Sequence, residues 1–105
     1  MEKKRSPRSS VFLDRVYRRS PKVVGRKIAD EFILVPVEEG AGEHDAIYTL
    51  NPVAAELWQR LDGKKTLRAI AAGLRKKFNV GRSTVETDVC SFIRVLEKIR
   101  VVRWV

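Results

Sequence analysis

The chain has 105 residues and a formal net charge of +9, with 44% hydrophobic and 33% charged residues. This length fits one domain with one hydrophobic core, and no apolar run approaches the roughly 18 residues that span a bilayer. The composition therefore predicts a soluble domain and excludes an integral membrane protein. No apolar stretch of a secretory signal follows the basic N-terminus, so we expect a cytoplasmic location.

The positive charge is concentrated at the N-terminus. Residues 1–22 carry eight basic and two acidic side chains, whereas the rest of the chain carries 14 basic and 11 acidic ones. Residues 1–21 are polar apart from a short apolar cluster, and so short a segment is a marginal helix in water. The sequence predicts that residues 1–21 form a basic, mostly disordered arm and that residues 22–105 form the folded domain.

Three short segments have the residue types of β-strands. Residues 23–29, 32–37 and 47–50 are rich in β-branched and aromatic side chains, and the polar pair 30–31 suits a tight turn between the first two. Pro36 lacks an N–H group and belongs near a strand end or at a sheet edge. These features predict a small antiparallel sheet of three strands.

Two helices are expected next, each marked by residues that suit its ends. Asn51 and Pro52 fit the N-cap and first position of one helix, and Gly63 fits the left-handed residue after its end. Thr66 fits the N-cap of the following helix, which residues 79–81 should end.

A third helix is expected from the spacing of Ser83 and Glu86, which forms a capping box in which each side chain satisfies a backbone donor of the other. Residues 101–105 are too apolar for a free tail and should pack back on the domain. The apolar stripe of this helix comprises Val85, Val89, Phe92, Leu96 and Ile99. Strands followed by helices predict an α+β fold, with a three-stranded antiparallel sheet packed on a three-helix bundle.

The sequence is poor in groups that perform catalysis. His44 is the only histidine and lies in an acidic, glycine-containing stretch at 38–45, which we interpret as a solvated hairpin loop. Cys90 is the only cysteine, which excludes an internal disulfide and a cysteine metal cluster, and we interpret it as a small buried residue. We therefore expect no enzymatic activity, no metal and no cofactor.

An interaction surface remains as the functional hypothesis. A sheet of three short strands exposes an edge, and the segment 47–50 has no Lys or Pro to block pairing with another chain. An extended peptide could add there as a further strand. On the third helix, Val95 and Ile99 lie on one flank of Phe92 and could form the wall of an apolar groove, although these side chains could equally pack as core.

A spaced set of residues resembles the signature of the PqqD family. In that signature a tyrosine-containing strand enters Leu-Asn-Pro, a tryptophan-bearing helix ends in Asp-Gly, and the last helix carries an Asp-Val pair before Phe-Leu. The resemblance extends over roughly residues 22 to 102. The matching residues are Ile47-Tyr48-Thr49-Leu50-Asn51-Pro52, Ala54, Ala55, Leu57-Trp58, Leu61-Asp62-Gly63, Thr66, Ile70, Leu74, Asp88-Val89, Phe92-Ile93 and Leu96.

This resemblance implies a winged helix-turn-helix-like fold that recognises ribosomally synthesised precursor peptides. Family members bind the leader segment as a strand beside strand three and helix three, and present it to a modifying enzyme, commonly a radical S-adenosylmethionine protein. One departure is Arg100, where the family usually has a glycine, so we expect a fraying turn there. The implied contact residues are Ile47, Tyr48, Thr49, Leu50, Asp88, Phe92, Val95 and Ile99.

The alternative hypothesis is a winged-helix regulator that binds nucleic acid, because the same helix arrangement can enter a major groove. For the peptide-binding hypothesis the partners are the precursor peptide and its maturation enzyme, and we expect a monomer or a dimer through the edge strand. The cations that favour nucleic acid are Arg68, Arg75, Lys76 and Lys77 on helix two and Arg94, Lys98 and Arg100 near helix three.

Overall fold

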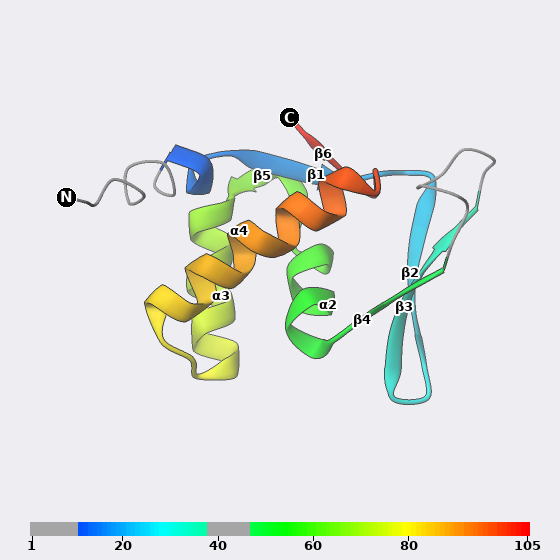
Figure 1. Ribbon diagram of the computed structural model, residues 1–105, viewed down its shortest axis with the longest axis horizontal. Helices are drawn as coiled ribbons and strands as arrows, with labels where there is room; N and C mark the ends of the chain where they lie inside the picture. Colours follow the sequence, from blue (N-terminus) through cyan, green and yellow to red (C-terminus); the bar gives the residue numbers. More distant parts are fainter. Residues whose placement is uncertain (1–10, 38–46) are drawn as a thin grey trace.

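The computed structural model describes residues 11–37 and 47–105, shown in Figure 1. The predicted loop at 38–45 and the first ten residues of the predicted arm lie outside this part of the chain. After a helical turn at 11–13, the elements are β1 (Val16–Arg19), β2 (Val23–Ile28), β3 (Glu31–Pro36), β4 (Tyr48–Leu50), α2 (Pro52–Gln59), β5 (Asp62–Thr66), α3 (Leu67–Phe78), α4 (Arg82–Lys98) and β6 (Val102–Trp104).

The strands form two antiparallel sheets, in the orders β2-β3-β4 and β5-β1-β6. The first is the predicted three-stranded sheet, and Pro36 ends its middle strand as expected. The α+β class is confirmed. The second sheet was not predicted, and strands and helices are less segregated than expected because β5 lies between α2 and α3 while β6 follows α4.

The N-terminal boundary of the domain was predicted wrongly. Strand β1 pairs with β5 on one side and with β6 on the other, so residues from 11 onward belong to the fold. Side chains alternate along the strand, and Tyr17 is completely buried while Arg18 and Arg19 remain exposed. The segment therefore has the composition of a solvated arm although it is the central strand of a sheet.

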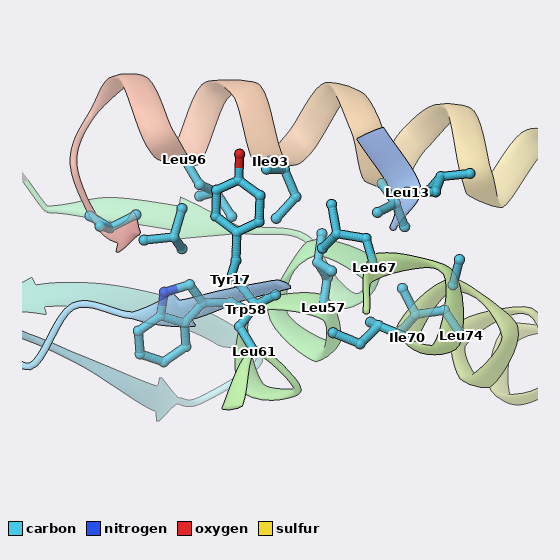
Figure 2. Packing of buried hydrophobic residues seen from close by; sticks show 14 of the residues in the cluster. Leu13, Tyr17, Leu57, Trp58, Leu61, Leu67, Ile70, Leu74, Ile93 and Leu96 are labelled. Carbon is cyan, nitrogen blue, oxygen red and sulfur yellow. The ribbon is translucent and has the colours of Figure 1, made fainter. Parts of the chain in front are cut away.

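Tyr17 is the centre of the packing between this sheet and the helices. Its ring rises from β1 toward α4, between Ile93 and Leu96 (Figure 2). The Tyr17 hydroxyl donates to Glu97 Oε1 at 3.1 Å and accepts from Arg15 Nη1 at 3.1 Å. Burial raises the pKa of the Tyr17 phenol, so the hydroxyl keeps its proton and remains a donor.

The predicted caps of α2 and α3 are confirmed. Asn51 Oδ1 accepts a hydrogen bond from the Ala54 N–H at 2.8 Å, and Thr66 Oγ1 accepts one from the Ala69 N–H at 3.1 Å. Asn79 adopts the left-handed conformation, with φ of 53°, at the end of α3. Each cap depends on one side chain and its own backbone, which is why sequence suffices to find it.

Two other predicted helix ends are wrong. Gly63 does have a positive φ of 79°, but it lies inside β5, where the register against β1 shifts. Helix α4 begins after Gly81, which provides no side-chain cap. The capping box therefore does not form, because Ser83 lies inside the helix, and Glu86 accepts from Arg82 Nε at 3.2 Å instead.

Helix α4 ends in an ordered left-handed turn, which corrects the expected fraying. Arg100 has a φ of 65°. The Arg100 N–H donates to the Glu97 carbonyl at 3.0 Å, and the Val101 N–H donates to the Leu96 carbonyl at 3.1 Å. This pair of bonds is the Schellman motif, normally built on glycine. The chain then enters β6, where Val101 and Val102 pack back on the core as predicted.

We predict that Arg100→Gly stabilises the protein. A non-glycine residue in the left-handed region costs about 1–2 kcal/mol, which the higher backbone entropy of glycine partly offsets. Urea denaturation should show a free energy of unfolding higher by about 0.5–1 kcal/mol. Arg100→Ala removes the same charge but keeps the strain, so an equal gain from Arg100→Ala would contradict this explanation.

We also predict that deleting residues 1–21 abolishes cooperative unfolding, whereas deleting residues 1–10 does not. The longer deletion removes β1 and leaves β5 and β6 without their shared neighbour. It also removes Tyr17 from the core. Circular dichroism during heating measures the difference, and a sharp transition in the longer deletion would show that β1 is dispensable.

Candidate functional site

Strand β4 lies at the end of its sheet. It pairs antiparallel with β3, with Phe32 opposite Leu50 and Leu34 opposite Tyr48. Among the strands in the described ranges, none lies on its other side. We call this outer side, from Ile47 to Leu50, the β4 edge. Among the described residues, the segment that was predicted to form an edge strand is therefore a terminal strand of its sheet.

The side chains of the β4 edge divide into two groups. Tyr48 and Leu50 are half-buried and pack against the core. Thr49 is exposed, and Ile47 is 63% exposed directly before the strand. The inward pair anchors the strand on β3 and α2, which leaves Ile47 and Thr49 as its outward side chains.

The predicted residues of α4 lie in one stripe, which we call the α4 stripe. Asp88, Phe92, Val95 and Ile99 are spaced by three or four residues, which places them on one face of a helix. Phe92 and Ile99 are half-buried against the core, whereas Asp88 is exposed and Val95 is 56% exposed. The fully packed ridge of the helix comprises Val85, Val89, Ile93 and Leu96 instead.

The neighbours of α4 define which flank the α4 stripe occupies. Glu86 lines a hollow between α3 and α4. On another flank, Glu97 accepts from Tyr17, and the Arg94 guanidinium lies 5.1 Å from the centre of the Phe12 ring. Successive residues of a helix turn by about 100°, so the α4 stripe lies on the flank turned away from both α3 and the N-terminal segment.

Helix α2 connects the two sets of residues. It packs on α4 and also on β4, whereas the main contacts of α4 are with α3, β6 and α2. Strand β4, which carries the β4 edge, and α4, which carries the α4 stripe, therefore both pack on α2. The main contacts of each element are with other elements and not with each other.

A hollow of about 250 Å³ lies on the inner side of the β2-β3-β4 sheet, and Leu50 lines it. The hollow could not be predicted from the sequence. Its walls come from the β2-β3 hairpin, β4, α2 and α3, which are separate in the chain and come together only in the fold. The lining residues are Lys27, Asp30, Phe32, Leu50, Pro52, Ala55, Glu56, Gln59, Lys77 and Phe78.

The negative charge of Glu56, which lines this hollow, is compensated by two cations of the protein. Glu56 accepts from Arg60 Nε at 2.9 Å and from Lys77 Nζ at 3.0 Å. These hydrogen bonds, that from Arg60 above all, hold the pKa of the Glu56 carboxyl below its usual value. The carboxylate is therefore committed to a structural role that links α2 with α3.

The described residues offer little for catalysis. Burial raises the pKa of the Cys90 thiol, so it remains protonated and is a poor nucleophile. In residues 11–37 and 47–105, no three side chains of His, Cys, Asp or Glu gather where a metal ion could bind. No helix within these ranges is long and apolar enough to cross a membrane.

We predict that Glu56→Gln destabilises the protein near neutral pH but not in acid. A carboxyl whose pKa is lowered by folding stabilises the fold above its unfolded pKa, and this contribution disappears as the pH falls through the folded pKa. Urea denaturation at pH 7 should show a loss of about 1 kcal/mol, and the loss should shrink toward pH 3. Glu31→Gln, at an exposed position, is the control, and a pH-independent loss in Glu56→Gln would contradict the ion-pair explanation.

The structure defines a class of small α+β domain that has an antiparallel sheet ending in β4 and a helix, α4, with a partly exposed apolar stripe. Residues 31–102 match the family model described as coenzyme PQQ synthesis protein D, or PqqD. This match covers most of the chain, so the chain belongs to the PqqD family.

Two solved structures have a similar fold. One is TbiB1 in complex with the TbiA(beta) leader peptide, with 26% sequence identity and a TM-score of 0.67, covering 82% of this chain and 94% of that chain. The other is a lasso peptide synthetase B1 complexed with the leader peptide, with 20% identity and a TM-score of 0.67, covering 83% and 96%. No curated protein sequence matches the chain. The chain thus shares its fold with two proteins solved with leader peptides bound.

Proposed function

We propose that this protein binds the leader segment of a ribosomally synthesised precursor peptide as an additional strand on the β4 edge. The observation that carries the proposal is the terminal position of β4 in its sheet. Family membership supports it, because TbiB1, which is 26% identical, was solved with a leader peptide. The outer side of a terminal strand can offer backbone N–H and C=O groups to an extended chain that reaches it.

The α4 stripe is the second wall of the proposed site. The main chain of the peptide pairs with the β4 edge, and its side chains reach Phe92, Val95 and Ile99. Val95 is apolar and 56% exposed, so covering it with an apolar side chain of the peptide would be favourable. Asp88 adds a carboxylate at the N-terminal end of the stripe, which suits a basic or hydrogen-bonding group of the peptide.

In this proposal the protein holds the peptide for an enzyme and performs no chemistry itself. The protonated thiol of Cys90 and the structural role of Glu56 support a non-catalytic protein. The partner enzyme is a maturation enzyme of such peptides, for example a radical S-adenosylmethionine protein. We place the complex in the cytoplasm, with the protein as a monomer so that the β4 edge stays available.

The nucleic-acid alternative finds less support. It requires the winged helix-turn-helix-like description, which remains a proposal, and free cations on α3 and α4. Arg68 Nε lies 3.2 Å from Asp14 Oδ1, and Lys77 Nζ lies 3.0 Å from Glu56 Oε1. Two of the cations that would contact phosphates are therefore paired within the protein.

We predict a period of two when the leader peptide is N-methylated one residue at a time. In antiparallel pairs, alternate residues direct both backbone groups to the neighbouring strand. Methylation at those positions should weaken binding at least about fivefold, since each lost hydrogen bond contributes roughly 1 kcal/mol. The intervening positions should tolerate the methyl group. Isothermal titration calorimetry measures the series, and a flat profile would contradict strand addition.

We further predict that Val95→Arg weakens leader-peptide binding at least about tenfold, because a charge would replace an apolar wall. Val95 is exposed, so the melting temperature should change little. Val105→Arg, at a position 65% exposed at the C-terminus, is the matched control. Full affinity in Val95→Arg would remove the α4 stripe from the site. Salt-sensitive binding of duplex DNA without saturable peptide binding would favour the nucleic-acid alternative.

A further inference from the structure

Strand β3 is apolar on both of its faces. Phe32-Ile33-Leu34-Val35 is a continuous apolar run, which is typical of strands that are covered on both sides. One face is covered within the protein, since Leu34 is 1% exposed and the ring centres of Phe32 and Trp58 lie 6.2 Å apart. Ile33 and Val35 point to the opposite face, which we call the outer face.

The neighbouring strands extend the outer face. Residues directly opposite each other in an antiparallel pair share one face, and Val24 lies opposite Val35 while both Arg26 and Thr49 lie opposite Ile33. Val24 is 39% exposed and Ile28 is 54% exposed. The helices lie on the other side of this sheet (Figure 1). The outer face therefore comprises Val24, Arg26, Ile28, Glu31, Ile33, Val35 and Thr49.

The remaining parts of this chain are unsuited to cover the outer face. Apart from glycine and proline, residues 1–10 and 38–46 contain only Met1, Ala41 and Ala46 as apolar residues. Burying the β-branched side chains of the outer face needs larger apolar groups than these. A cover for the outer face would therefore come from another molecule.

The size of the outer face argues against a second copy of this chain as the cover. Two strands of six residues and one of three, about 4.8 Å apart with about 3.3 Å per residue, present roughly 240 Å². A stable interface buries about 800 Å² on each partner. A partner that binds the outer face must also contact adjoining surface, which includes the β4 edge and the outer side of β2.

We propose that the outer face docks the enzyme that acts on the bound peptide, an inference that rests on the proposed function. A peptide strand beside β4 continues the sheet, so its alternate side chains enlarge the same face. The enzyme then contacts the protein and the peptide together and binds the loaded protein more tightly than the free one. Arg26 and Glu31 are both exposed on the outer face, so the docking surface of the enzyme is apolar and carries groups complementary to one cation and one carboxylate.

The test compares the wild type with a double variant, Val24→Glu with Ile28→Glu. The probes are the leader peptide of the cognate precursor and the enzyme that modifies that precursor. In biolayer interferometry the wild type should bind the enzyme at least about fivefold more tightly when the peptide is present, which corresponds to a coupling of about 1 kcal/mol. The double variant should keep its peptide affinity within about twofold but lose at least about tenfold in enzyme affinity.

Two controls separate docking from folding. Val105→Glu changes an exposed valine outside this sheet and should leave enzyme binding unchanged. The pair Val24→Thr with Ile28→Thr keeps β-branched side chains, so it should fold normally and show an intermediate loss. The melting temperature of each variant is measured alongside.

Several results would overturn the proposal. These are unchanged enzyme affinity in the double variant, enzyme binding that ignores the peptide, no enzyme binding to the loaded wild type, or a wild-type dimer that the double variant dissociates. The last result would assign the outer face to a second copy. Failure of the wild type to bind the leader peptide would instead refute the proposed function itself, so the two failures are distinguishable.

Discussion

The burial of Tyr17 between β1 and α4 is the contact on which the rest of the domain depends. It joins the N-terminal strand to the last helix across 80 positions of sequence, with the hydroxyl donating to Glu97. A buried phenol is stabilising only when its hydroxyl has partners, and Arg15 supplies the second one. Because β1 pairs on both sides, this contact positions β5, β6 and α4 together, and with α4 the α4 stripe.

The chain passes from one sheet to the other at Ser20, and the two sheets have different roles. The Ser20 N–H donates to the Val101 carbonyl at 3.0 Å, and Ser20 Oγ accepts from the Lys22 N–H at 3.2 Å. Beyond this junction the β5-β1-β6 sheet supports the helices, while the β2-β3-β4 sheet offers its edge and its outer face. A strand added to β4 would therefore leave the pairings of β1 unchanged.

The sequence was sufficient to predict those features of the fold that depend on one side chain and the backbone next to it. The caps at Asn51 and Thr66 and the end of α3 at Asn79 were found, because each concerns a few adjacent backbone groups. Gly63 was correctly expected to need a positive φ, but whether that φ ends a helix or bends a strand depends on the pairing of β5 with β1. Arg100 shows the reverse case, since tertiary packing imposes the left-handed conformation on an unfavourable residue.

The sequence did not predict which distant segments pack or pair with each other. Strand β1 presents its arginines to solvent, so only its pairing with two distant strands identifies it as part of the core. On α4, the periodicity correctly placed Val85, Val89 and Leu96 on the buried face, whereas the division between buried Ile93 and exposed Val95 depends on where α3 and β1 lie. The hollow beside Leu50 has no sequence signal at all, because four elements contribute to it.

The contrast between the two faces of the β2-β3-β4 sheet supports regarding it as an interface. On the inner face, a Cβ atom added at Gly25 would lie 2.5 Å from Phe32 and 2.6 Å from Trp58, so the packing at Gly25 leaves no room for a side chain. On the outer face, Ile28 remains 54% exposed in the same strand. A sheet that faces water on one side normally alternates apolar and polar residues, and β3 does not. Exposing β-branched side chains gains nothing for an isolated domain, but it fits a sheet that binds another strand at its edge and a second protein across its face.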